Sequence, residues 1–199
     1  MVDPHSLKPV RAGDTGEIWV RGGSVAQGYW ERPELSQQVF HARIADAGPA
    51  YLRTGDLGFM RDDQLYVTGR LKDLIIVNGK KYVPQDIEDN CERSHDALRQ
   101  SCGAAFHVSD AQGERLVVVF ELRREWLRRH QEWPAVLSSM RSSVITEYGL
   151  PVSDIVLLMP GALPRTSSGK VRRIQCRMDY LTGVLERAAP QNTARCKAT

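Results

Sequence analysis

Pro164-Arg165-Thr166-Ser167-Ser168-Gly169-Lys170 is the stretch from which the rest of the chain can be interpreted. It follows the apolar run 155–159, which has the length and composition of a buried strand. Ser, Thr and Gly favour a mobile loop whose backbone N–H groups can face an anion. The lysine at its end supplies a compact charge that can move onto a phosphate. The alternative is an exposed loop whose lysine is only solvated.

The lysine of this loop stands out because lysine is rare in the chain. Six of the 27 basic residues are Lys and the other 21 are Arg, so Lys170 is not typical of the general surface charge. The loop is not a Walker A motif, because Pro164 stands where the first glycine is needed and Val171 stands where Ser or Thr is needed.

Composition and charge limit the classes of function. The 199 residues fit one domain, or one domain and a smaller second one. A formal charge of +3 is too small to indicate nucleic acid, and aromatic residues are not interleaved with the arginine pairs as a stacking surface requires. The arginine pairs, such as Arg172-Arg173, are interpreted as solvated helix faces.

The cysteines and histidines do not form a recognisable metal site. The four cysteines have no C-x-x-C spacing and the five histidines have no H-E-x-x-H motif, which predicts free thiols, a reducing cytoplasmic compartment and no structural metal. Aliphatic runs of about five residues are far shorter than the roughly 20 needed to span a bilayer. No signal peptide is evident at the N-terminus.

The first seventy residues alternate short apolar runs with turn residues, which predicts a small β-rich subdomain. Here the pattern predicts strands at 17–21, 51–54 and 65–68, a helix through Phe40 that begins near Pro33, and a loop over 41–50. The residues from 71 to 187 instead alternate strands and helices. Strands are expected at 74–77, 80–83, 102–108, 116–122 and 155–159, and helices at 84–94, 133–148 and 173–185.

Together these patterns predict an α+β fold in two parts. Residues 1–70 form the β-rich part, residues 71–187 form a compact α+β domain with a mixed sheet and flanking helices, and residues 188–199 form a disordered tail.

Four blocks of sequence occur in this order: Gly16-Glu17-Ile18 with Gly28-Tyr29-Trp30, Arg53-Thr54-Gly55-Asp56-Leu57-Gly58, Gly69-Arg70-Leu71-Lys72-Asp73-Leu74-Ile75-Ile76, and the lysine loop 164–170. Together they resemble the adenylate-forming superfamily, which includes acyl-CoA synthetases, luciferases, peptide-synthetase adenylation domains and fatty acyl-AMP ligases. The run Pro84-Gln85-Asp86-Ile87-Glu88 resembles the fatty acyl-AMP ligase branch in particular, although Lys80-Lys81 departs from the Asn-containing turn of that branch.

The resemblance implies a domain organisation. The first phosphate-binding loop of the family and its aromatic-Gly-x-Thr-Glu motif do not occur in this sequence. Residues 1–70 therefore resemble the C-terminal end of the large adenylation domain, and residues 71–187 resemble the mobile C-terminal lid. The chain is then expected to be a piece of a longer enzyme and to be inactive alone.

The resemblance also implies roles for individual residues. Lys170 matches the lysine that acts in adenylation, and Asp56 matches the acceptor of the two ribose hydroxyls of ATP. Arg70 would add a ribose or phosphate contact, and Lys72 matches the hinge between the domains. Gly79 could approach an incoming pantetheine arm. The alternatives are a turn-forming aspartate, a surface ion pair, a linker lysine and a plain turn glycine.

The implied reaction uses ATP and Mg²⁺, with the metal bound mainly by the N-terminal domain. A fatty or other carboxylic acid becomes an acyl-AMP, and a carrier-protein phosphopantetheine thiol then takes the acyl group, as in lipid, polyketide or lipopeptide biosynthesis. Coenzyme A is the alternative acceptor. A different class of function, a stand-alone module that binds anions or a carrier protein, also remains open.

Overall fold

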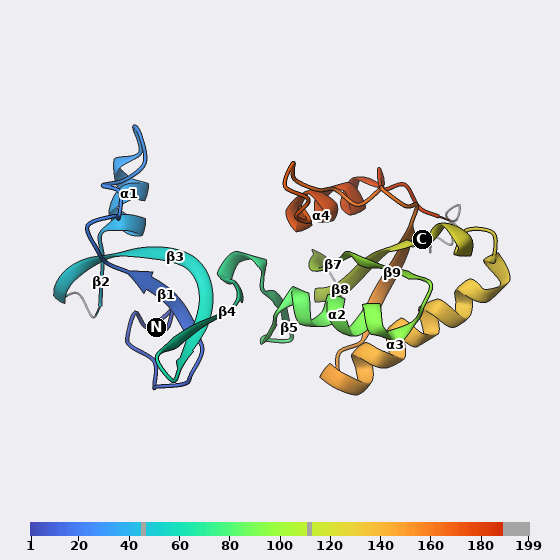
Figure 1. Ribbon diagram of the computed structural model, residues 1–199, viewed down its shortest axis with the longest axis horizontal. Coiled ribbons are helices and arrows are strands. Elements are labelled where there is room, and N and C mark those ends of the chain that lie inside the picture. The colour runs from blue at the N-terminus through green and yellow to red at the C-terminus, as the bar shows by residue number, and fades with distance from the viewer. Residues whose placement is uncertain (45–46, 111–112, 189–199) are drawn as a thin grey trace. The chain divides into compact units, whose positions relative to one another are not determined.

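The computed structural model describes residues 1–44, 47–110 and 113–188. The chain divides into two compact units, Met1–Asp73 and Leu74–Thr199, shown in Figure 1. Helices and mixed sheets confirm the α+β class. The predicted tail lies outside the described residues except for Ala188, whose N–H donates to the Leu157 carbonyl at 2.8 Å.

The first unit is built on one long strand, β3 (Ala47–Arg61), which bends around the unit in Figure 1. β1 (Gly16–Val20) and β2 (Ala42–Ile44) pair antiparallel with it, and so does β4 (Gln64–Arg70), which follows a tight turn. Helix α1 (Pro33–Phe40) begins at a proline, as predicted, and the short 3₁₀ turn η1 (Leu71–Asp73) ends the unit.

Two predictions for this unit are wrong. The loop expected over 41–50 contains β2 and the start of β3, and the strand expected at 51–54 extends to Arg61. Hydrogen bonds between backbones hold these segments in the sheet. Their small residues, Ala and Gly, show no alternation of apolar and polar side chains, so the sequence pattern did not indicate strands. The block 55–58 also lies within β3 and does not form a turn, because β1 and β4 both pair with it.

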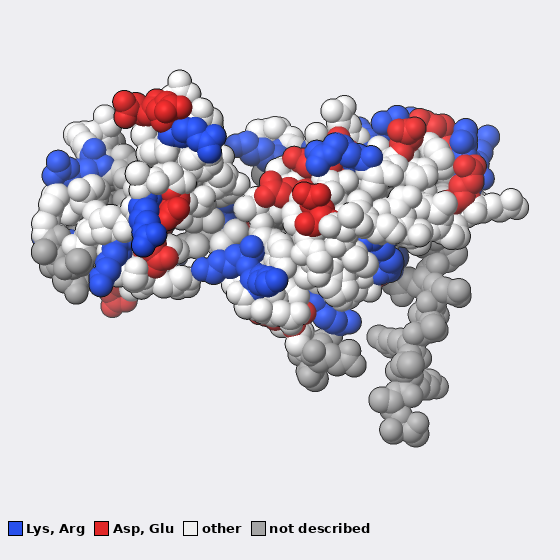
Figure 2. Space-filling model, turned by 90° about the horizontal axis from the view of Figure 1, so that it is seen from below, with Lys and Arg blue, Asp and Glu red and all other residues white. Residues whose placement is uncertain are grey.

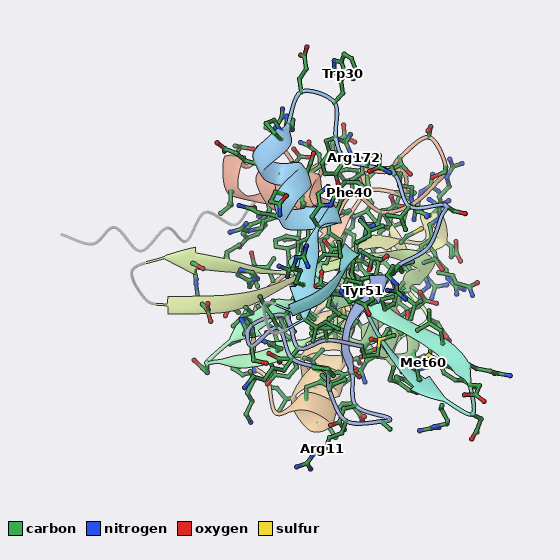
Figure 3. All side chains as sticks on the ribbon, turned by 90° about the vertical axis from the view of Figure 1, so that its left-hand side faces the viewer. Arg11, Trp30, Phe40, Tyr51, Met60 and Arg172 are labelled. Carbon is green, nitrogen blue, oxygen red and sulfur yellow. The ribbon has the colours of Figure 1, made fainter. Side chains whose placement is uncertain are left out.

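The segment between β1 and α1 carries an exposed aromatic residue. Trp30 is 88% exposed and points away from the unit in Figure 3, whereas the neighbouring Tyr29 ring meets the Phe40 ring edge-on at 5.0 Å. The Tyr29 N–H also donates to the hydroxyl of Ser36 on α1 at 2.8 Å. The contacts of Tyr29 with α1 therefore leave Trp30 directed into solvent.

The second unit begins with a hairpin and a helix that agree with the prediction. β5 (Ile75–Val77) and β6 (Lys80–Tyr82) are joined by Asn78-Gly79, whose φ angles of 51° and 73° are those of a type I′ turn. Helix α2 (Pro84–Ser94) follows, with Pro84 in its first turn.

A three-stranded mixed sheet forms the centre of this unit. β7 (Leu98–Asp110) pairs antiparallel with β8 (Gly113–Leu122), and β8 pairs parallel with β9 (Val152–Leu158). The 3₁₀ turns η2 (Arg124–Trp126) and η3 (His130–Glu132) and helix α3 (Trp133–Tyr148) make the crossover. Helix α4 (Arg173–Thr182) ends at Gly183, earlier than predicted, because Gly183 adopts a φ of 75°.

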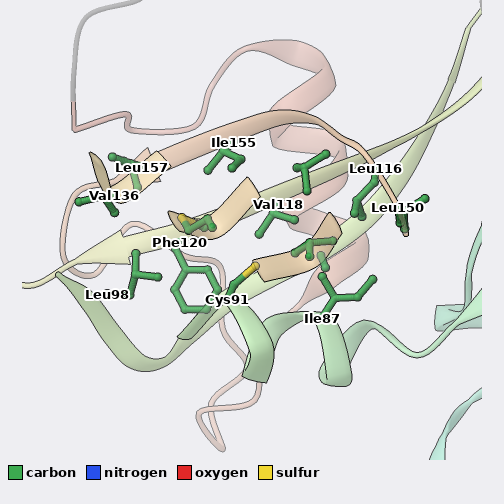
Figure 4. Close-up of a cluster of buried hydrophobic side chains, with 14 of the residues drawn as sticks. Ile87, Cys91, Leu98, Leu116, Val118, Phe120, Val136, Leu150, Ile155 and Leu157 are labelled. Carbon is green, nitrogen blue, oxygen red and sulfur yellow. The ribbon is translucent and has the colours of Figure 1, made fainter. Parts of the chain in front are cut away.

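Both faces of the sheet are covered. Ile87 and Cys91 of α2 and Val136 of α3 pack with Phe120 on one face, as the close-up in Figure 4 shows. Cys176 of α4 packs with β7, β8 and β9 residues on the other face. This unit therefore has three layers, with α2 and α3 on one side of the sheet and α4 on the other.

Three free cysteines, Cys91, Cys102 and Cys176, lie buried in this unit, and Cys196 lies outside the described residues. Burial raises the pKa of the Cys91 and Cys176 thiols to about 12, so both remain protonated at neutral pH. They act as small apolar packing groups and not as nucleophiles.

We expect Gly103→Ala to destabilise the second unit by about 1–3 kcal/mol, because the added methyl would lie 2.2 Å from a Phe120 ring carbon. Thermal unfolding followed by circular dichroism measures this loss. Gly23→Ala is the control, since a methyl there meets no atom within 4 Å. Equal melting temperatures for the two variants would contradict the close packing of Gly103 on Phe120.

Candidate functional site

The lysine loop is a closed hairpin and not the mobile loop that its composition predicted. Arg165 and Val171 form a bridge at its base. The Thr166 N–H donates to the Lys170 carbonyl at 2.8 Å, and the Gly169 N–H donates to the Thr166 carbonyl at 2.9 Å. Gly169 has a φ of 81°, which favours glycine at this position of the turn.

The hairpin uses its own backbone donors. Besides the N–H groups of Thr166 and Gly169, the Lys170 N–H donates to the Thr166 hydroxyl oxygen at 3.0 Å. These three groups therefore do not face an anion in this conformation. The exposed Lys170 side chain remains as a positive charge on a four-carbon arm, carried by a hydrogen-bonded support.

Asp56 and Arg70 are brought together on neighbouring strands. They are direct partners in the pairing of β3 with β4, and the Arg70 Nε donates to Asp56 Oδ1 at 2.7 Å. This hydrogen bond, and then the charge of Asp56, raise the pKa of the Arg70 guanidinium. The pair is partly exposed, so the other oxygen, Oδ2, can accept a hydroxyl hydrogen while Arg70 fixes the orientation of the carboxylate.

Glu17 organises the strand that carries Asp56, a role that the sequence alone did not indicate. Its carboxylate is 1% exposed and accepts the Arg53 Nε at 3.0 Å and Nη2 at 2.9 Å. It also accepts the Trp19 Nε1–H at 2.9 Å and the Gly55 N–H at 3.2 Å. Glu17 therefore fixes the backbone one residue before Asp56. No spacing rule links positions 17 and 53, and a glutamate in a half-buried strand usually faces solvent.

Lys72 and Gly79 lie on either side of the division between the two units. Lys72 is exposed in the η1 turn, the last element of the first unit. Gly79, in the second unit, has no atom within 4 Å of the position that a Cβ would occupy. A ligand could therefore approach this glycine turn closely.

Metal-binding residues do not gather in the described ranges. No group of three or more His, Cys, Asp and Glu side chains could hold an ion in residues 1–44, 47–110 and 113–188. Within these same ranges, no helix is long and apolar enough to cross a membrane. Figure 2 shows basic and acidic side chains interspersed on the face in view.

Comparison with known proteins bears on these motifs. The family model described as "Disco-interacting protein 2-like, AMP domain" matches residues 72–189, which is more than half of the chain. A medium-chain-fatty-acid–[acyl-carrier-protein] ligase of Moorena producens (strain JHB), JamA, is 42% identical over 200 residues. That alignment covers 100% of this chain and 33% of the Moorena protein.

Two further matches are to fatty acyl-AMP ligases. The long-chain-fatty-acid–AMP ligase FadD26 of Mycobacterium marinum (strain ATCC BAA-535 / M) is 38% identical over 88% of this chain and 31% of its own length. A structure from studies of fatty acyl-adenylate ligases of E. coli and L. pneumophila has a TM-score of 0.68 and 31% identity. It matches 88% of this chain and 29% of the solved one.

These matches agree with the four sequence blocks and with the α+β architecture. The chain spans about a third of the length of the curated relatives it matches. It belongs to the adenylate-forming superfamily, in its fatty acyl-AMP ligase branch.

Proposed function

We propose that the chain is the C-terminal portion of a ligase that activates a fatty acid with ATP and passes the acyl group to a carrier-protein thiol. The observation that carries this proposal is an exposed lysine on a closed hairpin, in a chain whose relatives are named as acyl-AMP and acyl-carrier-protein ligases. The first unit would be the end of the large adenylation domain, and residues 71–187 would be its mobile lid.

Lys170 would act in the first half-reaction. A carboxylate oxygen attacks the α-phosphorus of ATP, the bond to the β-phosphate oxygen breaks, and pyrophosphate leaves with the bonding electrons. Negative charge gathers on the α-phosphoryl oxygens, where a positioned cation lowers the barrier. The hairpin limits the motion of the lysine backbone, so its ammonium group can be delivered with little loss of conformational freedom.

Asp56 and Arg70 would bind the nucleotide. The carboxylate of Asp56 is an acceptor for the ribose hydroxyls, and Arg70 holds one of its oxygens in place. Mg²⁺ would shield the phosphates, with its ligands expected mainly from the N-terminal domain of the enzyme.

The second half-reaction would require the lid to turn. Lys72 stands in a short 3₁₀ turn at the division of the units, where a few exposed residues can absorb a large change in φ and ψ. Gly79 would then allow the pantetheine arm to pass close to the backbone.

The proposal can be tested with a chimeric ligase in which this chain replaces the matching third of the Moorena relative. Pyrophosphate release with a panel of carboxylic acids reports adenylation, and transfer from pre-made acyl-AMP to carrier protein or to coenzyme A identifies the acceptor. No pyrophosphate release above that of the Moorena N-terminal part alone would contradict the proposal. Salt-sensitive binding to a carrier protein without catalysis would instead support a stand-alone module.

We expect Lys170→Ala to slow acyl-AMP formation by about 10²–10³-fold, because the cation at the α-phosphate is lost. Transfer from pre-made acyl-AMP should change little, since no phosphoryl transfer occurs in that step. Lys8→Ala, which removes an exposed lysine of the first unit, is the control. An adenylation rate equal to that of the control would refute this role of Lys170.

We expect Asp56→Asn to raise the KM for ATP by about 10–100-fold, because the ribose hydroxyls lose a charged acceptor. Asp14→Asn, in an exposed turn, should leave the KM unchanged. Initial rates of pyrophosphate release at varied ATP concentration measure both. A KM for Asp56→Asn equal to that of the parent would show that the ribose binds elsewhere.

Lys72→Pro should impair acyl transfer more than adenylation, because the proline ring fixes φ at a position that must rotate. Lys72→Ala, which also removes the side chain but leaves φ free, should keep both rates. Separate assays of the two half-reactions make the comparison. Equal losses in both half-reactions for Lys72→Pro would count against a hinge at this position.

A further inference from the structure

Two buried carboxylates contact the polypeptide on either side of the lysine hairpin. Glu121 is 1% exposed and Glu88 is 5% exposed, and both belong to secondary-structure elements distant in sequence from residues 164–172. Ionised carboxylates are rarely buried unless they are paired and hydrogen-bonded. The hydrogen-bond partners of these two carboxylates therefore show which parts of the chain each one holds in place.

Glu121 holds the residue that leads into the hairpin. Its Oε1 accepts the N–H of the buried Leu163 at 2.9 Å, and its Oε2 accepts the Arg99 Nη1–H at 2.7 Å. Alternate residues of β8 point to opposite faces of the sheet, so Glu121 lies on the same face as Val117 and Val119. A carboxylate thus occupies a position where the pattern of β8 would place an apolar side chain.

Glu88 holds the residue that follows the hairpin. Its two oxygens accept the Arg173 Nε–H at 2.7 Å and Nη2–H at 2.6 Å, a bidentate pair between α2 and the start of α4. The Ala105 N–H, on the outer strand β7, donates to the same carboxylate at 2.9 Å. The pair therefore joins two helices that are 85 residues apart in the sequence.

Arg165 adds a contact at the base of the hairpin. One of its nitrogens, Nη1, donates to the Gly169 carbonyl at 2.6 Å, and the other, Nη2, donates to the Ser101 carbonyl at 2.5 Å. Ser101 lies in the irregular part of β7 between Leu98 and Gly103. The hairpin is thus attached to the sheet before and at its base, and to α2 after it.

We propose that Glu121 and Glu88 are positioning residues for Lys170, which hold the two ends of its hairpin on the sheet and helix of the second unit. This inference rests on the proposed function, because it requires Lys170 to act on the nucleotide. With both ends fixed, movement of the unit carries the lysine as part of a rigid body. A hairpin released at either end would place the ammonium group less accurately, and small misplacements cost large factors in rate.

Amide hydrogen exchange on the 199-residue chain directly tests the structural part of this inference, that the two glutamates hold the ends of the hairpin. Glu121→Gln and Glu88→Gln keep the side-chain shape but remove the charge, so a hydrogen bond at one end of the hairpin is lost or weakened. The Thr166 and Gly169 amides should then exchange about tenfold faster. If Glu88→Gln fails to fold, Arg173→Lys breaks the same bidentate pair from the other side.

The control is Asp154→Asn. It weakens the contact of the Tyr180 hydroxyl on α4 with Asp154 on β9, at 2.9 Å, without touching the hairpin. Unchanged exchange at Thr166 and Gly169 in the Glu121 and Glu88 variants would overturn the inference. Equal acceleration of these two amides in Asp154→Asn would also overturn it, because loss of stability alone would then explain the effect.

The activity of the chimeric ligase tests the catalytic part of the inference, that the two glutamates position Lys170 for adenylation. Glu121→Gln and Glu88→Gln should lower the kcat of adenylation by about 10²-fold, with the KM for ATP and the transfer step unchanged. Lys170→Ala is measured beside them. If Lys170→Ala lowers adenylation but the glutamate variants do not, the inference falls and the proposed function stands. If Lys170→Ala has no effect, the role of Lys170 and this inference both fall, whereas the proposed function itself falls only if the parent chimera releases no pyrophosphate.

Discussion

Strand β8 is the element on which the second unit depends, because its residues from Leu116 to Leu122 are buried on both sides of the sheet. Even-numbered positions such as Phe120 enter the core with α2 and α3, and odd-numbered positions such as Val119 enter the core with α4. A strand of this kind requires a helical layer on each face. The parallel pairing of β8 with β9 further requires a long crossover, which α3 supplies. Because β9 runs parallel to β8, it ends beside Glu121, at the end of the sheet where the lysine hairpin begins.

The elements with strong local signals could be predicted from the sequence. Pro84 indicated the start of α2, Gly149 indicated the end of α3, and Asn78-Gly79 indicated a two-residue hairpin turn, and the structure has each of them there. The superfamily and its fatty acyl-AMP ligase branch were also identified from motifs, and the comparisons confirm both. The roles of Lys170, Asp56, Arg70, Lys72 and Gly79 remain predictions, as does the assignment of the two units to a large domain and a lid.

The features that sequence reasoning missed depend on contacts between distant residues. β2 and the early part of β3 are held by backbone pairing, which leaves no pattern in small side chains. Glutamate is usually a surface residue. The burial of Glu17, Glu88 and Glu121 is possible only because each has a hydrogen-bond partner, 36, 85 and 42 positions away in the sequence, respectively. The arginine pair 172–173 was interpreted as solvated for the same reason, although Arg173 binds Glu88. The three glutamates thus show that the composition of a sequence does not reveal which of its charged residues are buried.

Strand β4 has a consequence for the behaviour of the isolated chain in solution. Among the described residues it pairs with β3 alone, and it carries exposed Leu65, Tyr66 and Val67, the last of these 64% exposed. An outer strand with unpaired backbone groups beside apolar side chains is a template for addition of a strand from a second molecule. Self-association should therefore rise with protein concentration. Dilute samples, or lysine in place of Val67, are suitable choices for biophysical work on this chain.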